Sequence, residues 1–326
     1  MSFVGDILFL DLGTKCNNDC YFCVVRGKKI AVLEEGVALA KILDGAEKGI
    51  RNVVFSGGES TLREYLISAI DAARDSGYLS IQVQTNGRTL SDIDFVRSLK
   101  AAGVTEFSIS LHGSDCRMHE KITRVPGSFR ETLSGIANVR SIYQDETIIA
   151  TNTVITYDNL EFLHEVISLL IRSGVPFVQM AYMHGQGAAA EIYKEITPPM
   201  SAARPWISRA IKAANRLGYF EGKVTVEAYP YCFLKGVEGY SSDVSMPRSF
   251  VRTEDGEELE EFVFDGPRAK ADFCAHCTFD GYCHGPWRDY PEAFGWDEFV
   301  PIRDRLPEDC IPGFLLNRAV DGTDVH

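Results

Sequence analysis

Three cysteines near the start of the chain are spaced to bind one metal assembly. Cys16, Cys20 and Cys23, here called the N-terminal cysteines, form a C-x3-C-x2-C segment directly after the apolar run 7–12. A loop with this spacing can direct three thiolates to one site, and thiolate-rich sites suit iron–sulfur clusters or zinc. Three ligands leave one corner of a four-iron cluster open for another molecule. The alternatives are a zinc site completed by a distant histidine, and three unrelated thiols, which this spacing disfavours.

A second group of cysteines lies near the C-terminus. Its members, here called the C-terminal cysteines, are Cys274, Cys277 and Cys283 in a C-x2-C-x5-C segment, with Cys232 as the expected fourth thiolate. Such a set suits an iron–sulfur cluster, and it also suits zinc with His276 or His284 as a ligand. Cys116 and Cys310 are expected to be free thiols.

Composition and charge narrow the functional class. The 326 residues include 46 acidic and 33 basic side chains, for a net charge of −13. Such a surface repels phosphate backbones, so we expect no nucleic-acid partner. The start of the chain lacks the pattern of a secretory signal, and no window approaches the ~20 apolar residues that span a bilayer. We therefore expect a cytoplasmic protein without membrane contact, whose grouped cysteines bind metal rather than form disulfides.

Short apolar runs alternate with amphipathic stretches of helical length. The expected strands are 7–12, 52–55, 79–84, 106–111, 148–155 and 177–182. The expected helices are 33–48, 62–76, 90–102, 129–142, 160–173 and 202–217. Six β–α alternations indicate an α/β fold with a parallel sheet and helices outside, either a full or partial barrel or a flat doubly wound sheet. Beyond residue 218 turns, aromatic residues and cysteines dominate, which predicts a small domain held together by metal.

The N-terminal cysteines, with an aromatic residue, Phe22, before the last of them, resemble the hallmark of the radical S-adenosylmethionine (SAM) superfamily. The resemblance implies that the three cysteines hold a [4Fe-4S] cluster, whose fourth iron binds the amino and carboxylate groups of SAM. One electron then cleaves SAM to a 5′-deoxyadenosyl radical, which abstracts a hydrogen atom from the substrate. It also implies a partial (β/α)6 TIM-type barrel in residues 1–218.

Two further segments follow in the order expected for that superfamily. Gly57, Gly58 and Glu59 resemble the motif that receives the SAM amino group, with Glu59 or neighbouring carbonyls as the acceptors. Thr85 and Asn86 end the third expected strand and are similar to the family's TNG segment. Taken alone, a Gly-Gly-Glu sequence is only a turn before a helix, and Asn86 only a turn former.

A third matching segment resembles the peptide-maturase and molybdopterin-precursor branch of the superfamily. By this resemblance Ser110 would contact SAM, Arg124 would bind its carboxylate, and Asn152 would contact the ribose. His112 stands where that branch usually has Asp, which puts any role of that carboxylate in doubt. The alternative is that Ser110 faces solvent on its strand and Arg124 is a surface cation.

The C-terminal cysteines resemble the auxiliary-cluster extensions of radical SAM enzymes, the one-cluster twitch domain or the two-cluster SPASM domain. Too few cysteines are present for two clusters, so the resemblance implies one auxiliary [4Fe-4S] cluster in residues 219–326. It could be structural, relay an electron from the oxidised substrate, or bind the substrate directly. Four protein ligands favour the relay.

The function we expect is oxidation of a peptide or a small molecule by dehydrogenation or cross-linking, with an electron donor such as flavodoxin or ferredoxin. Glu227, Tyr231 and His184 are the candidate proton acceptors. Because the first strand begins close to Met1, we expect any leader peptide to be bound by another protein or a different surface. The alternatives are a redox-neutral mutase or lyase with a structural C-terminal metal, and a non-catalytic iron–sulfur carrier or sensor.

Overall fold

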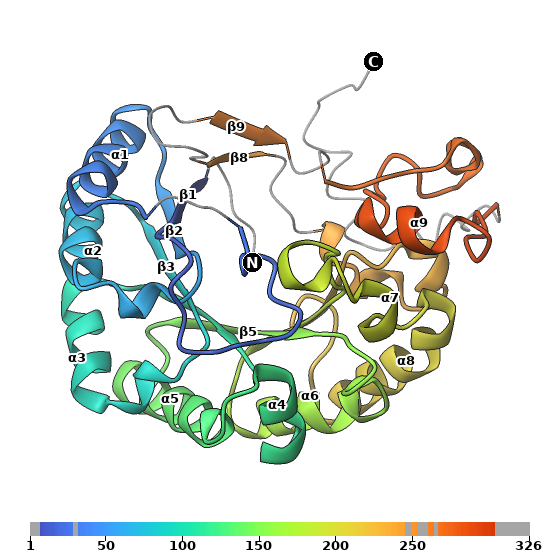
Figure 1. Cartoon of the computed structure of the whole chain (residues 1–326), viewed down its shortest axis with the longest axis horizontal. Helices are drawn as coiled ribbons and strands as arrows, with labels where there is room; N and C mark the ends of the chain where they lie inside the picture. The colour runs from blue at the N-terminus through green and yellow to red at the C-terminus, as the bar shows by residue number, and fades with distance from the viewer. Residues whose placement is uncertain (1–6, 29–31, 245–248, 253–259, 264–266, 304–326) are drawn as a thin grey trace.

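The computed structural model describes residues 7–28, 32–244, 249–252, 260–263 and 267–303 (Figure 1). The expected free thiol of Cys310 lies outside these ranges. The described part of the chain forms one curved sheet surrounded by helices (Figure 1). None of the helices described in it is long and apolar enough to cross a membrane.

Seven parallel strands form the barrel wall in the order β7-β6-β5-β4-β3-β2-β1. Their bounds are β1 Ile7–Asp11, β2 Asn52–Ser56, β3 Ser80–Thr85, β4 Glu106–Ser110, β5 Ile148–Val154, β6 Phe177–Ala181 and β7 Val224–Glu227. Within the described residues β1 and β7 do not pair with each other, so the barrel is partial. This confirms the predicted partial barrel rather than the flat doubly wound sheet.

Three strands extend the six that we predicted. β7 pairs with β6, although it follows the domain boundary expected after residue 218. On the other side, β8 (Ser249–Arg252) pairs in parallel with β1, and β9 (Glu260–Val263) pairs antiparallel with β8. Each of the three has only four residues, which is too short for an alternating pattern to stand out. The barrel sheet therefore takes strands from both parts of the chain.

Helices cover the outside of the sheet, and Figure 1 shows them as a ring around the strands. Their bounds are α1 Glu35–Glu47, α2 Leu66–Asp75, α3 Ile93–Ala102, α4 Cys116–Thr123, α5 Ser128–Tyr143, α6 Leu163–Arg172, α7 Tyr193–Ile196, α8 Met200–Arg216 and α9 Asp289–Phe294. We did not predict α4, because its sequence CRMHEKIT is mostly polar. Its start is fixed by Asp115, whose carboxylate accepts a hydrogen bond of 2.8 Å from the backbone N–H of Met118.

Alternation along each strand decides which side chains reach the barrel interior. On β1, Leu8 and Leu10 are fully buried within the hydrophobic core, whereas Phe9 and Asp11 line an interior cavity. The same period of two places polar side chains at the ends of the neighbouring strands inside the barrel. The parallel register aligns these ends, for example Ser110 of β4 beside Asn152 of β5.

Candidate active site

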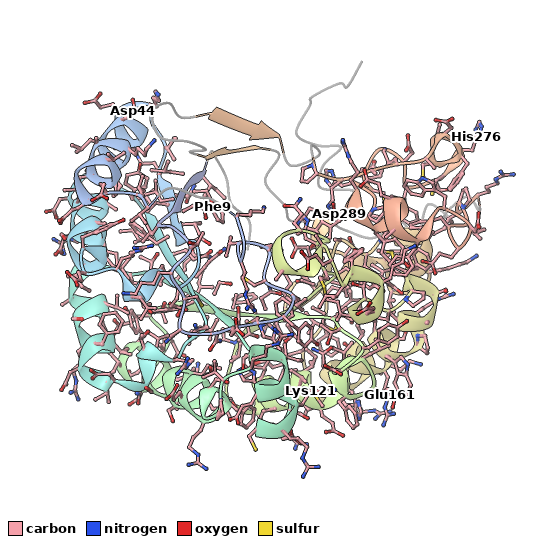
Figure 2. The ribbon with its side chains drawn as sticks, in the orientation of Figure 1. Phe9, Asp44, Lys121, Glu161, His276 and Asp289 are labelled. Carbon is pink, nitrogen blue, oxygen red and sulfur yellow. The ribbon has the colours of Figure 1, made fainter. Side chains whose placement is uncertain are left out.

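A cavity of about 500 Å³ opens at the C-terminal ends of the strands. Its wall includes Ser56 of β2, Gln84 of β3, Ser110 of β4, Asn152 of β5 and Glu227 of β7. Figure 2 shows Phe9 inside the ring of helices, whereas Asp44 and Glu161 lie on its outer side. Active sites of (β/α) barrels lie at this end of the sheet because the loops that follow the strands meet there.

All three N-terminal cysteines line this cavity. Their loop follows β1 and is held at several points by backbone hydrogen bonds. The N–H of Asp19 donates to the carbonyl of Thr123 at the end of α4, at 2.9 Å. The N–H of Ala188 donates to the carbonyl of Cys23, also at 2.9 Å. The loop that carries the cysteines is therefore fixed by segments distant from it in sequence.

Burial raises the pKa of two thiols of this loop. The pKa of Cys20 is raised to about 12, mainly by burial and then by the neighbouring Cys23 and Cys16. The pKa of Cys16 is also raised, mainly by burial. A metal that binds here must displace these protons, so loading depends on the metal's own charge.

The two glycines after β2 are required by the cysteine loop itself. A Cβ on Gly57 would lie 2.6 Å from the carbonyl oxygen of Gly13, and Gly57 also has a φ of +122°. A Cβ on Gly58 would lie 2.5 Å from the carbonyl oxygen of Lys15. The N–H of Gly58 donates to the Gly13 carbonyl at 2.7 Å. The two glycines thus allow their backbone to approach the backbone of the cysteine loop closely, whereas we expected a close approach to SAM. Both glycines also line the cavity.

Glu59 points away from the cavity and joins the ends of two strands. Its Oε1 accepts hydrogen bonds from the hydroxyls of Thr61 and Thr85, both at 2.6 Å, and its Oε2 accepts from the N–H of Asn86 at 2.7 Å. The side chain is only 2% exposed, and burial raises its pKa. Glu59 does not line the cavity, whereas Thr85 and Asn86 do.

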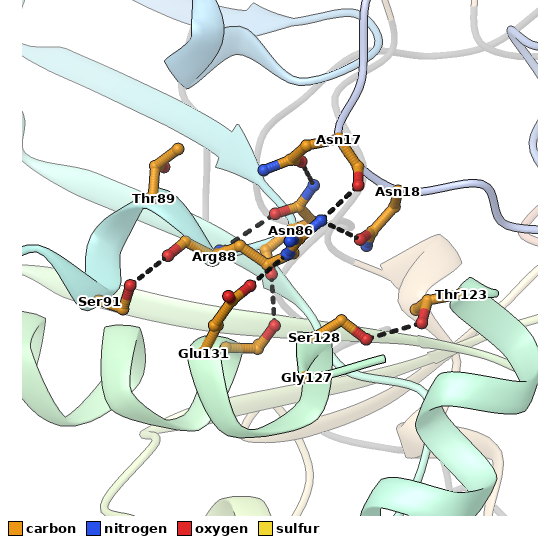
Figure 3. Close-up of polar contacts among 12 residues, drawn as sticks. Asn17, Asn18, Asn86, Arg88, Thr89, Ser91, Thr123, Gly127, Ser128 and Glu131 are labelled. Atoms are coloured by element: carbon orange, nitrogen blue, oxygen red, sulfur yellow. Dashed lines mark hydrogen bonds and ion pairs between the residues drawn. The ribbon is translucent and has the colours of Figure 1, made fainter. Parts of the chain in front are cut away.

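Arg88 connects the segment after β3 to the cysteine loop (Figure 3). Its Nη1 donates to the carbonyl oxygen of Asn17 and to Oδ1 of Asn18, the latter at 3.2 Å. Its Nε forms an ion pair of 2.5 Å with Glu131 of α5. In parallel, Nδ2 of Asn86 donates to Oδ1 of Asn17 at 2.6 Å. We missed Arg88 in the sequence, although it directly follows the Thr85-Asn86-Gly87 segment.

We expect Arg88→Met to lower the free energy of unfolding by about 2 kcal/mol, because hydrogen bonds to a charged group contribute about 1.5–3 kcal/mol. The loosened loop should also lose bound iron faster to a chelator. Urea unfolding and the decay of visible absorbance measure the two effects. Arg97→Met removes an exposed ion pair with Asp94 and should change stability by less than about 0.5 kcal/mol. Equal behaviour of the two variants would contradict the role of Arg88.

Ser110 and Asn152 face the cavity from adjacent strands. The Oδ1 of Asn152 is buried and has no hydrogen-bond partner among the described residues. A buried acceptor without a donor costs free energy, so this position suits a ligand that supplies one. The arrangement fits a polar cofactor placed between the cysteine loop and the ends of β4 and β5.

His112 lines the cavity in front of a second buried histidine. Its ring contacts Phe22 edge to face at 4.9 Å and stacks on His119 at 5.9 Å. Nδ1 of His112 accepts from the N–H of Val154 at 3.3 Å, and Nδ1 of His119 accepts from the N–H of His112 at 3.2 Å. Both imidazoles are thus held with the proton on Nε2. His112 cannot supply the charge of the aspartate usual at this position.

These histidines make stability depend on pH. Burial lowers the pKa of His112 to about 3 and that of His119 to about 4. The unfolded chain binds these protons below about pH 6.5, so the free energy of unfolding should fall as pH decreases from there to about 4. We expect His119→Gln to reduce this slope by about 1.4 kcal/mol per pH unit, measured by urea unfolding. The partly exposed His164, changed to Gln, is the control, and an unchanged slope in His119→Gln would contradict the prediction.

Arg124 lies apart from these residues. It ends α4 in the left-handed conformation, with φ of +57°, and its side chain is exposed. Its guanidinium lies 5.8 Å from the ring centre of Tyr21, and it does not line the cavity. The structure therefore brings together all the expected SAM-contacting residues except Glu59 and Arg124.

Comparison with known proteins places this arrangement in a family. Residues 10–170 match the family model of the Radical SAM superfamily. This part of the chain belongs to the radical SAM superfamily. Radical SAM proteins use a [4Fe-4S] cluster and SAM, and the N-terminal cysteines, the cavity they line and the unpartnered Asn152 fit these groups.

Curated relatives of this chain include proteins named as probable GTP 3′,8-cyclases. The protein from Sulfurisphaera tokodaii is 30% identical over 183 residues, which cover 55% of this chain and 56% of the relative. That from Saccharolobus solfataricus is 29% identical over 192 residues, covering 58% and 60%. The chain thus spans little more than half the length of the curated relatives it matches.

Solved structures share the fold over most of the chain. Streptococcus suis SuiB bound to the precursor peptide SuiA has a TM-score of 0.65 at 13% identity, covering 94% of this chain and 76% of SuiB. The protein anSMEcpe with bound AdoMet and Kp18Cys peptide has a TM-score of 0.60 at 14% identity, covering 97% and 98%. At this level of identity the likeness concerns the fold.

Beyond the radical SAM barrel, all four C-terminal cysteines line one small cavity of about 30 Å³. Burial, and then the nearby Cys283, Cys277 and Cys274, raise the pKa of Cys232 to about 12. An aromatic pair covers this site, with the rings of Tyr231 and Phe279 stacked 4.7 Å apart. The structure thus brings together the four thiols that we expected to share one metal site.

The three candidate proton acceptors do not share one environment. Glu227 and His184 line the cavity of about 500 Å³ that holds the N-terminal cysteines, here called the radical SAM cavity. Tyr231 instead lies beside the C-terminal cysteines. Oε2 of Glu227 accepts a hydrogen bond of 2.7 Å from Nε2 of Gln179. His184 is 3.6 Å from the carboxylate of Asp289.

Trp287, which sequence reasoning missed, forms part of the cavity wall. Its ring stacks on His184 at 3.5 Å and lies 4.3 Å from the guanidinium of Arg268 on the opposite side. Cys283, Gly285 and Pro286, just before it, line the cavity of the C-terminal cysteines. The segment 283–287 therefore faces both cavities, and its only signal in the sequence is its position directly after the last cysteine of the group.

Proposed function

We propose that the chain is a radical SAM enzyme that abstracts a hydrogen atom from a peptide or small-molecule substrate and oxidises it with the help of an auxiliary [4Fe-4S] cluster. The observation that carries this proposal is the segment 283–287, which lines both the radical SAM cavity and the cavity of the C-terminal cysteines. A cluster in the second cavity would be separated from the first cavity by this short segment.

In this proposal the N-terminal cysteines hold the first cluster, and when SAM is bound the pair supplies a 5′-deoxyadenosyl radical. The protein's part is to position SAM and the substrate and to exclude water. Ser110, Asn152 and the backbone at Gly57 and Gly58 would contact SAM, because these groups face the cavity. Glu59 would act indirectly by fixing Thr85 and Asn86, so the acceptors for the SAM amino group would be neighbouring carbonyls.

For the second site we propose a four-iron cluster rather than zinc. Zinc holds its thiolates at about 2.3 Å in a tight tetrahedron. Among the described residues, no three Cys, His, Asp or Glu side chains are arranged to hold a single ion. The N-terminal cysteines likewise form no such single-ion group within the described ranges, and they belong to a family that binds a four-iron cluster.

Glu227 is the proposed proton acceptor. It lies in the cavity wall at the end of β7, and burial raises its pKa. A carboxylate that is more basic than usual suits proton transfer near neutral pH. Electrons would come from a reducing partner such as flavodoxin or ferredoxin.

A second candidate function is a redox-neutral reaction, supported by the relatives named as probable GTP 3′,8-cyclases. In that case the C-terminal metal would be structural. The two candidates share the first step and differ in whether the second cluster changes oxidation state during turnover.

Anaerobic reconstitution followed by dithionite and SAM tests the common step. We expect release of 5′-deoxyadenosine and methionine, together with about eight iron and eight sulfide per chain for two four-iron clusters. A reconstituted protein that binds SAM without cleaving it would instead be a carrier or sensor. About four iron with one zinc would exclude an auxiliary iron–sulfur cluster.

A further inference from the structure

The radical SAM cavity has an unequal distribution of charge. Two carboxylates, Asp11 and Glu227, line it, and among its described lining residues none is Lys or Arg. Proteins bind phosphate groups with Lys, Arg or helix N-termini, and they bind ammonium or guanidinium groups with carboxylates. The described wall therefore favours a cation and disfavours a polyphosphate.

Glu227 is the carboxylate placed most directly for such a contact. It ends β7 opposite Ala181 of β6, and both residues line the cavity. Gln179, on the same face, donates to Oε2 at 2.7 Å and so fixes the direction of the carboxylate. A neutral amide donor orients the group and leaves its charge in place.

Arg268, the arginine whose charge acts on Glu227, is engaged elsewhere. Arg268 is 3% exposed, and its Nη2 forms an ion pair of 2.8 Å with the buried Asp243. Its Nη1 donates to the carbonyl of Gly285 at 2.6 Å, and the guanidinium packs on the face of Trp287 away from His184. Arg268 thus lies behind the wall with its charge balanced by Asp243.

The carboxylate of Glu227 is partly buried, and within the described ranges it forms no ion pair with a Lys or Arg side chain. Burial is the largest influence on its pKa and raises it, although Arg268 and His184 act in the opposite direction. Withdrawing a carboxylate from water without a full counter-charge is unfavourable. A cationic group on the ligand would remove this cost in the complex.

We propose that this cavity takes a substrate with an ammonium or guanidinium group, held by Glu227, and rejects nucleoside polyphosphates. The inference rests on the proposed function only in that it concerns the substrate of the same site. The substrate class proposed here differs from GTP, the substrate that appears in the names of the curated relatives. The same carboxylate would bind the cation in the resting complex and accept a proton during turnover.

Binding to the reconstituted full-length chain with SAM tests the proposal without turnover. The probes are Ac-Ala-Lys-Ala-NH2, its uncharged norleucine analogue, butylammonium and GTP. The affinity of each is measured by tryptophan fluorescence or calorimetry. We expect the lysine peptide or butylammonium to bind at least about tenfold more tightly than the norleucine peptide, with affinity falling as salt increases. If the lysine peptide has the higher affinity, the amine belongs to a peptide. If butylammonium has the higher affinity, the amine belongs to a small molecule.

The variant Glu227→Gln keeps the shape and the contact with Gln179 but removes the charge. It should weaken binding of the cation at least about tenfold, whereas the exposed Glu161→Gln should not change it. Binding of GTP, equal binding of the two peptides, or full affinity in Glu227→Gln would overturn the proposal. SAM cleavage by the unsubstituted chain, measured in parallel, separates the two ideas, because its absence sinks the proposed function and its presence leaves only the substrate class in question.

Discussion

Cys20→Ala should abolish reductive cleavage of SAM, leaving 5′-deoxyadenosine at the level of a reaction without enzyme. Cys20 lies in the middle of the cysteine loop and lines the cavity. With two ligands left, a four-iron cluster loses its attachment, so iron should fall from about eight to about four per chain. Liquid chromatography of the products and iron analysis measure the two effects.

The matched control for this variant is Cys116→Ala. Cys116 is exposed at the start of α4 and belongs to neither cysteine group. We expect it to keep full iron content and full SAM cleavage. If Cys20→Ala still cleaved SAM at the wild-type rate, the N-terminal cysteines would not hold the reactive cluster.

Cys283→Ala should separate SAM cleavage from substrate oxidation. Cys283 is buried beside Asp243 and Arg268, and its Sγ accepts a hydrogen bond of 3.4 Å from the N–H of Gly285. We expect about half of the iron to be lost and one of two reduced-cluster signals to disappear from the electron paramagnetic resonance spectrum. Release of 5′-deoxyadenosine should continue while oxidised product falls to background.

Cys274→Ala provides an independent check, because its thiol lies at a less buried position of the same site. It should lose the same signal. A correctly folded variant at either position with full product turnover would exclude the electron relay and favour the redox-neutral candidate. Circular dichroism establishes that the variants are folded.

The barrel and the position of its cavity could be predicted because both follow from local patterns. Apolar alternation at Leu8 and Leu10 marks a strand, and a parallel sheet brings strand ends together. Ser110 and Asn152, which were expected to contact SAM, line the cavity at the ends of β4 and β5. Strands of four residues, such as β8 and β9, and the polar helix α4 carry too little pattern to be recognised.

The direction of individual side chains was harder to predict. Glu59 has the expected sequence position, but its carboxylate oxygens accept from Thr61, Thr85 and Asn86 instead of facing the cavity. Arg124 follows a helix whose existence the sequence did not indicate, and it faces outward. A motif gives the residue and its place in the chain, whereas competition among local hydrogen-bond partners decides where its side chain points.

The convergence of the C-terminal cysteines was expected, but only part of it follows from local pattern. Cys274, Cys277 and Cys283 are close in sequence, so their proximity in space is expected. Their union with Cys232 depends on how two distant segments pack, which no local pattern specifies. Trp287 enters the barrel cavity for the same reason.

The placement of segment 283–287 has a consequence for biosynthesis. Proteins emerge from the ribosome N-terminus first, and early parts of the chain can fold before later ones appear. A nascent chain that has emerged only as far as β7 has all three N-terminal cysteines, but Trp287 has yet to close its side of the cavity. Cluster insertion at the first site could therefore take place through this open side, and arrival of the last cysteines would then seal it.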